Sequence, residues 1–170
     1  MTEAGCITGA LFMKSRARVL VVDDEPLMRK MVRAILVGKG YCVETAGGAA
    51  DALDKLARSG FDIVVTDLRM PEIDGFEILA RVKQQWPNVG VIVMTGFGDA
   101  KTPDRARAKG ADEYITKPFN AREIEVIVER VCWRRMVLQG AGAPPLPIAD
   151  QTGSGKASSQ PKRSKLHPVH

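Results

Sequence analysis

Apolar positions along this chain alternate between two spacings from Arg18 onward. Short continuous apolar runs predict strands, and stretches in which apolar residues recur three or four positions apart predict amphipathic helices. The expected strands cover 19–22, 41–45, 61–66, 89–95 and 113–116. The expected helices cover 27–36, 49–56, 76–82, 100–109 and 124–131, and the fourth of them has few apolar anchors.

This order gives five consecutive strand–helix pairs. Such alternation predicts right-handed crossovers and a parallel sheet with helices on both faces, which is a doubly wound α/β domain. The runs 19–22, 63–65 and 91–94 are apolar throughout, as in strands that are buried on both faces. With 170 residues and 45% hydrophobic content, the chain can bury one domain core.

The composition changes after Leu138, where Gly, Pro and Ser become frequent and the helical periodicity ends. We expect a flexible extension over 1–15, one domain over 16–137 and a disordered basic tail over 138–170. The whole formal charge of +5 falls in residues 134–170, so the basic isoelectric point does not indicate a nucleic-acid-binding domain. DNA binding is therefore not expected, and the translation start is open between Met1 and Met13.

The cysteines and the longest apolar runs indicate the compartment in which the protein works and whether it crosses a membrane. The three cysteines are odd in number and form no CxxC pair, which supports neither a disulfide framework nor a zinc site. No apolar run approaches the roughly 18 residues of a membrane span. We therefore expect a protein of the reducing cytoplasm that does not associate with a membrane.

Polar side chains lie at the carboxyl ends of four of the predicted strands. Asp23 and Asp24 follow the first strand, Asp67 the third and Lys117 the fifth, while Thr95 ends the fourth. Since the carboxyl ends of parallel strands meet at one edge of the sheet, these residues are expected to converge. Clustered carboxylates without His or Cys favour Mg²⁺, and a nearby lysine can bind a phosphoryl oxygen. Asp67 is the candidate phosphoryl acceptor, because a carboxylate can form an aspartyl phosphate.

Each of these residues also has a purely structural interpretation. Asp23 and Asp24 can cap the helix that starts at "DDEP", and this role can coexist with metal binding. Asp67 can simply end a strand, and Thr95 is a common strand residue. Tyr114, on the fifth strand, has the pattern of a core or half-buried aromatic residue.

Four motifs together resemble the receiver domain of bacterial response regulators in two-component systems. They are "VVDDEP" (21–26), "VVTDLRMPEIDGFE" (64–77), "VIVMTGFG" (91–98) and "ADEYITKPF" (111–119), and the resemblance covers roughly 17–137. It implies a flavodoxin-like (βα)5 fold with the strand order 2-1-3-4-5. It also implies a signalling module and not an enzyme. We expect a stand-alone receiver similar to the chemotaxis regulators, because few residues follow the domain.

The resemblance implies a metal and phosphoryl site. Asp67 is the expected phospho-acceptor, and Mg²⁺ is expected on Asp23, Asp24, Asp67 and the backbone carbonyl of Arg69. Lys117 is expected to contact a phosphoryl oxygen, with a cis peptide bond to the proline that follows it.

The resemblance further implies a switch and a set of partners. Thr95 is expected to donate its hydroxyl to the phosphoryl group, and Tyr114 to follow the movement of Thr95. The surface formed by the fourth helix, the fifth strand and the fifth helix would then change shape. Expected partners are a sensor histidine kinase or a histidine phosphotransfer protein, a downstream partner protein and, after phosphorylation, a second copy of the chain.

Three alternatives stay open on the sequence. The first is a truncated or divergent regulator whose output domain is missing. The second is a phosphatase of the haloacid-dehalogenase type, which needs an aspartate where Arg69 stands. The third is a flavodoxin-like cofactor carrier, whose first loop should cradle a phosphate, whereas "DDEP" would repel one.

Overall fold

The computed structural model describes residues 17–71, 75–96 and 102–138. In chain order these ranges hold β1 (Arg18–Val22), α2 (Pro26–Gly38), β2 (Cys42–Ala46), α3 (Ala49–Arg58), β3 (Ile63–Asp67), α4 (Gly75–Gln85), β4 (Gly90–Thr95), α5 (Thr102–Ala108), β5 (Glu113–Thr116) and α6 (Ala121–Leu138). The predictions for 1–15 and for the tail beyond Leu138 lie outside the described residues. Within those ranges, no helix combines the length and apolarity needed to cross a bilayer.

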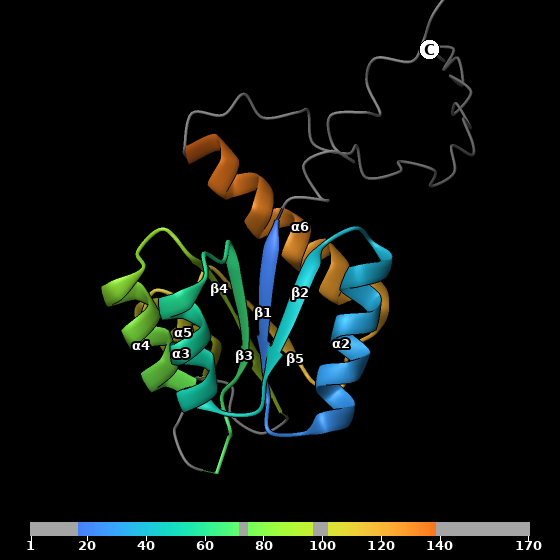
Figure 1. Ribbon diagram of the computed structural model, residues 1–170, viewed down its shortest axis with the longest axis horizontal. Coiled ribbons are helices and arrows are strands. Elements are labelled where there is room, and N and C mark those ends of the chain that lie inside the picture. The colour runs from blue at the N-terminus through green and yellow to red at the C-terminus, as the bar shows by residue number, and fades with distance from the viewer. Residues whose placement is uncertain (1–16, 72–74, 97–101, 139–170) are drawn as a thin grey trace, which may run out of the picture.

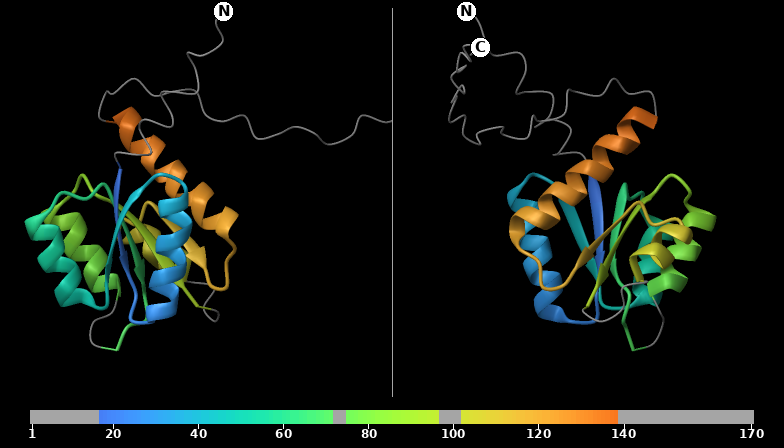
Figure 2. Two further views of the ribbon diagram at one scale, coloured as in Figure 1. Left: turned by 45° about the vertical axis from the view of Figure 1, so that its right-hand side comes forward. Right: turned by 180° about the vertical axis from the view of Figure 1, so that it is seen from behind.

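The strands form one parallel sheet in the order β2-β1-β3-β4-β5 (Figure 1). Helices α2 and α6 cover one face, and α3, α4 and α5 cover the other (Figure 2). The predicted doubly wound α/β fold and the strand order 2-1-3-4-5 are therefore confirmed.

The central strands contribute side chains to the cores on both faces, because successive residues of a strand point to opposite sides. In β3, Val64 packs on the side of α3 and α4, whereas Ile63 and Val65 pack on the side of α2 and α6. Both β3 and β4 are buried along their whole length. Burying an aliphatic side chain of this size stabilises a fold by roughly 1.5–3 kcal/mol. The carboxyl ends of these strands are thus anchored by the most deeply buried part of the domain.

Some boundaries differ from the sequence prediction. Asp67 is the last residue of β3, not the residue after it, because it is paired with Met94 of β4. Helix α6 continues to Leu138, although the apolar periodicity ends near Val131. No Gly or Pro interrupts the chain before Gly140, so nothing in the sequence stops the helix earlier.

The helices that follow β1 and β5 begin in different ways. In α6, the Asn120 side chain accepts a hydrogen bond from the Glu123 N–H at 3.0 Å, and the Glu123 carboxylate accepts one from the Asn120 N–H at 2.8 Å. In α2, Glu25 occupies the N-cap position and makes no side-chain cap hydrogen bond. The alternative in which Asp23 or Asp24 caps α2 is therefore wrong.

Gly75 starts α4 directly against the end of β3. A Cβ atom there would overlap the Asp67 carbonyl oxygen and lie 2.7 Å from Leu68 Cα. Because these are backbone atoms that cannot rotate away, we expect Gly75→Ala to lower the free energy of unfolding by roughly 1–3 kcal/mol. Urea denaturation measures this change.

The matched control for this prediction is Gly38→Ala at the end of α2, where an added Cβ meets nothing within 4 Å. Alanine also restricts the unfolded chain, so Gly38→Ala should be neutral or stabilise by up to about 1 kcal/mol. Equal free energies of unfolding for the two variants would contradict the prediction.

Candidate functional site

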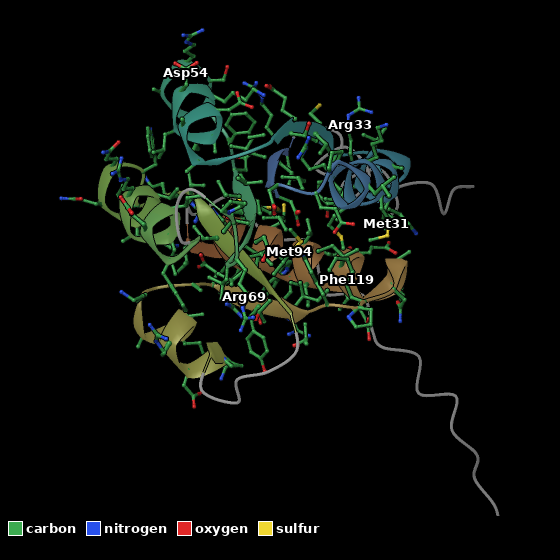
Figure 3. The ribbon with its side chains drawn as sticks, turned by 90° about the horizontal axis from the view of Figure 1, so that it is seen from below. Met31, Arg33, Asp54, Arg69, Met94 and Phe119 are labelled. Atoms are coloured by element: carbon green, nitrogen blue, oxygen red, sulfur yellow. The ribbon has the colours of Figure 1, made fainter. Side chains whose placement is uncertain are left out.

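Strand pairing brings the predicted residues to one edge of the sheet. The register of β1 against β3 places Asp23 level with Asp67. The pairing of β3, β4 and β5 then brings Lys117, which directly follows β5, to the same edge. Figure 3 looks onto this edge and labels Arg69 and Met94 beside it.

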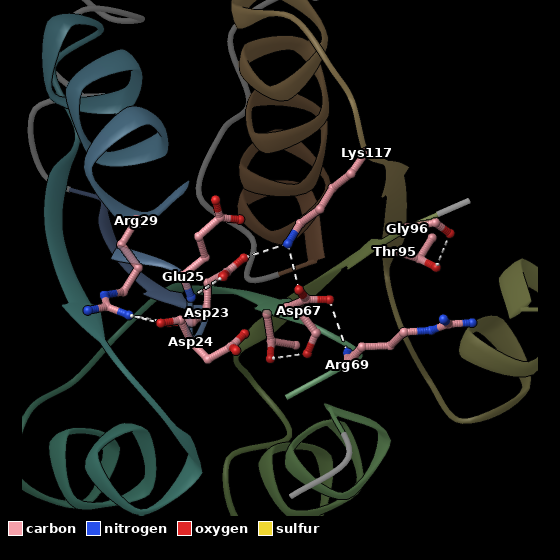
Figure 4. A network of polar contacts seen from close by, with 10 residues as sticks. Asp23, Asp24, Glu25, Arg29, Asp67, Arg69, Thr95, Gly96 and Lys117 are labelled. Atoms are coloured by element: carbon pink, nitrogen blue, oxygen red, sulfur yellow. Dashed lines mark hydrogen bonds and ion pairs between the residues drawn. The ribbon is translucent and has the colours of Figure 1, made fainter. Parts of the chain in front are cut away.

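Lys117 joins two of the carboxylates. Its Nζ atom lies 2.7 Å from Asp23 Oδ2 and 2.5 Å from Asp67 Oδ2 (Figure 4). The lysine side chain is only 16% exposed. The expected cis bond between Lys117 and Pro118 is present. One ammonium group therefore lies between carboxylates from β3 and from the loop after β1.

Two opposing influences act on the pKa of Lys117. Burial lowers this pKa, because the ammonium loses hydration. The hydrogen bonds to Asp23 and Asp67, together with their negative charges, outweigh burial and raise the pKa above its ordinary value of 10.5. Lys117 is therefore positively charged at neutral pH.

Asp23 and Asp24 differ in their surroundings. Asp23 is fully buried, its Oδ1 accepts a hydrogen bond from the Glu25 N–H at 2.8 Å, and its Oδ2 accepts the one from Lys117. Asp24 is exposed to solvent. The two adjacent carboxylates therefore differ: that of Asp23 is buried and hydrogen-bonded within the protein, and that of Asp24 faces water.

An acidic cluster forms as predicted. One carboxylate oxygen from each of Asp23, Asp24 and Asp67 lies within 4.8 Å of the other two. An all-oxygen set with one carboxylate facing water fits Mg²⁺, which binds a few carboxylates and keeps several of its waters. The residues present therefore suit this ion.

Asp67 lies at the centre of the cluster. Its Oδ1 accepts a hydrogen bond from the Arg69 N–H at 3.0 Å, while its Oδ2 accepts the one from Lys117. The residue is 7% exposed. The Arg69 side chain extends away from the Asp67 carboxylate (Figure 4). Sequence reasoning assigned the Arg69 carbonyl to the metal and missed its N–H, because a backbone donor leaves no trace in residue type.

Thr95 and Tyr114 lie on the side of the sheet that faces α5. Thr95 Oγ1 donates a hydrogen bond to the Gly96 carbonyl at 3.2 Å. Tyr114 is half-buried, and the Arg107 guanidinium lies 5.4 Å from the centre of its ring. The register of β4 against β5 places both residues on one face. Their coupling stays a prediction.

One residue of the site was not predicted. Arg29 of α2 donates from Nη1 to the main-chain carbonyl oxygens of Asp23, at 2.6 Å, and Asp24, at 2.9 Å. In the sequence it is one of three basic residues on this amphipathic helix, with Lys30 and Arg33, a pattern typical of a solvated face.

Comparison with known proteins assigns this chain to a family. The family model for the response regulator receiver domain matches residues 19–129. This chain belongs to that family. Receiver domains are signalling modules of two-component systems, so the resemblance noted from the four motifs is confirmed. The matched family is neither of those named by the phosphatase and flavin-carrier alternatives.

The curated proteins similar to this chain include regulators that are longer than the matched region. The DNA-binding transcriptional regulator NtrC of Escherichia coli is 36% identical over 115 residues, which cover 68% of this chain and 24% of NtrC. The transcriptional regulatory protein TrcR of Mycobacterium tuberculosis is 32% identical over 141 residues, which cover 83% of this chain and 55% of TrcR. The chain thus spans between a quarter and about half of these two relatives.

Solved structures agree in fold. The chemotaxis protein CheY4 of Vibrio cholerae aligns with a TM-score of 0.65 and 33% identity, covering 68% of this chain and 98% of that one. A CheY-like receiver domain protein from Methanospirillum hungatei aligns with a TM-score of 0.69 and 28% identity, covering 72% of this chain and 98% of that one.

The Lys117 contacts give a prediction for stability. Lys117→Met leaves Asp23 and Asp67 facing each other without the shared cation, so we expect a loss of roughly 1–3 kcal/mol in the free energy of unfolding at pH 7 without added metal. Because the folded-state pKa of Lys117 is raised, its contribution is complete below the ordinary lysine value and fades as pH rises through the folded value. The gap between wild type and variant should therefore close only at strongly alkaline pH.

Urea denaturation at neutral and alkaline pH measures this gap. The control is Arg81→Met, which removes the cation of an exposed Arg81–Glu77 pair and should cost at most about 0.5 kcal/mol. Similar losses in the two variants would show that the Lys117 contacts do not stabilise the fold.

Proposed function

We propose that this receiver accepts a phosphoryl group on Asp67, with Mg²⁺ bound, from a sensor histidine kinase or a histidine phosphotransfer protein. The observation that carries the proposal is the position of Asp67. Its carboxylate sits between the Lys117 ammonium, the Arg69 N–H and the carboxylates of Asp23 and Asp24. Such an arrangement suits an oxygen that must attack phosphorus in a strongly charged site.

The transfer step follows from this chemistry. A carboxylate oxygen of Asp67 attacks the phosphorus of a phosphohistidine and forms a P–O bond. The P–N bond breaks, and the imidazole nitrogen leaves with its electron pair and takes a proton from water. Bound Mg²⁺ would offset phosphoryl charge, held by Asp23, Asp24, Asp67 and the Arg69 carbonyl. Lys117 would move from sharing two carboxylates to contacting a phosphoryl oxygen.

The switch is proposed to pass from Thr95 to α5. The Thr95 hydroxyl, which now donates to the Gly96 carbonyl, would turn to donate to the phosphoryl group. Tyr114 would then move into the space that Thr95 leaves. Arg107 lies over the Tyr114 ring, so a rotation of that ring would change the contact between β5 and α5.

The output is proposed to be a partner-binding surface of α5, β5 and α6. A downstream protein would bind this surface, or a second copy of the chain would do so after phosphorylation. NtrC is a DNA-binding regulator, but its similarity to this chain covers only 24% of its length. We propose protein binding by the receiver as the output, with a truncated or divergent regulator as the alternative.

Phosphorylation by a small acyl phosphate with MgCl₂ tests the proposal. Intact-mass spectrometry should show one added phosphoryl group in the wild type, lost on treatment with alkali, and none in Asp67→Asn. Asp54→Asn is the control, because Asp54 lies on α3, where it pairs with Arg58. Equal phosphorylation of the wild type and Asp67→Asn would overturn the assignment of the acceptor. Steady hydrolysis of phosphate esters would instead favour a phosphatase.

A further inference from the structure

The acidic loop between β1 and α2 is held from two sides. On the sheet side, the Asp23 N–H donates to the Ala46 carbonyl oxygen at 3.2 Å, and Lys117 holds the Asp23 carboxylate. On the helix side, Arg29 Nη1 donates to the carbonyl oxygens of both Asp23 and Asp24. The guanidinium thus connects the first turns of α2 to the backbone of the loop that carries both aspartates (Figure 4).

Asp24 depends on this backbone connection more than Asp23 does. The Asp23 carboxylate is fixed by its own hydrogen bonds to Glu25 and Lys117. The Asp24 carboxylate is exposed, and no hydrogen bond or ion pair reaches it from residues in the described ranges. Its direction is therefore set by the conformation of its backbone, whose carbonyl oxygen Arg29 holds at 2.9 Å.

We infer that Arg29 is a positioning residue for Mg²⁺ binding, which holds the Asp23–Asp24 backbone so that the Asp24 carboxylate is directed at the ion. The inference rests on the proposed Mg²⁺ site. Partners that orient metal ligands typically change metal affinity by about 10–100-fold when they are removed. Arg29 fits this role because it contacts the ligand-bearing loop through main-chain oxygens and leaves both carboxylates available.

Charge and positioning predict opposite effects at Arg29. A cation near the site repels Mg²⁺, so removing its charge alone would tighten binding slightly. Releasing the loop frees Asp24 and would weaken binding. The two hydrogen bonds from the Arg29 guanidinium should matter more than the repulsion between its solvent-screened charge and Mg²⁺. We therefore expect the loss of positioning to dominate and Mg²⁺ binding to weaken.

The test is a titration of the full chain with MgCl₂, in which amide NMR shifts report Mg²⁺ binding. Arg29→Gln should raise the dissociation constant for Mg²⁺ by about tenfold. Arg29→Lys keeps the charge but replaces Nη1, which donates both hydrogen bonds, with an ammonium on a shorter side chain, so it should give an intermediate value. Arg33→Gln removes the same charge from the next turn of α2, where Arg33 is exposed, and should leave the constant unchanged or slightly lower. Unchanged amide shifts outside the loop show that the variants are folded.

The outcomes separate this inference from the proposed function. Wild-type binding with equal constants in Arg29→Gln and Arg33→Gln would overturn the inference alone, as would tighter binding in Arg29→Gln. Absence of Mg²⁺ binding in the wild type would overturn both the inference and the metal part of the proposed function. If Arg29→Gln does not fold, a wild-type constant in Arg29→Lys would overturn the inference, and a weaker one would support it.

Discussion

The ion pairs of Lys117 with Asp23 and Asp67 are the constraint on which the rest of the site depends. Their carboxylates lie 94 and 50 residues before the lysine in sequence, so the contacts form only when β1, β3 and β5 lie in register. A shift of one residue in any of these strands would turn its end to the opposite face of the sheet. The buried central strands therefore determine the position of one ammonium group, and through it the positions of two carboxylates.

Repulsion among the acidic side chains of the site limits the stability of the folded domain. Three carboxylates lie close together, only two of them pair with Lys117, and Asp23 is fully buried. Mutual repulsion of the acids opposes folding, whereas a bound divalent cation would relieve it. Stability instead comes from β3 and β4, which are buried throughout, so the site can carry unbalanced charge on a rigid support.

Much of the architecture could be predicted from the sequence, because the signals were apolar runs and residue types at strand ends. The five strands and the convergence of Asp23, Asp24, Asp67 and Lys117 follow from such signals, whereas the strand order was implied by the resemblance to receiver domains. Interactions that use the backbone could not be predicted. The hydrogen bonds from Arg29 to two carbonyl oxygens, and from the Arg69 N–H to Asp67, depend on chain geometry that residue type does not encode.

Strand alternation divides the site between the two faces of the sheet. Asp23, Asp67 and Lys117 continue the positions of β1, β3 and β5 that pack toward α2 and α6. Thr95 continues the opposite set, which it shares with Tyr114 and which packs toward α5. Among the described residues of α5, only Ala106 is buried. The Arg107 guanidinium of this helix lies over the Tyr114 ring of β5. Under the proposed switch, phosphorylation of Asp67 would therefore act on this weakly anchored helix from the other face of the sheet, through Thr95 at the end of β4.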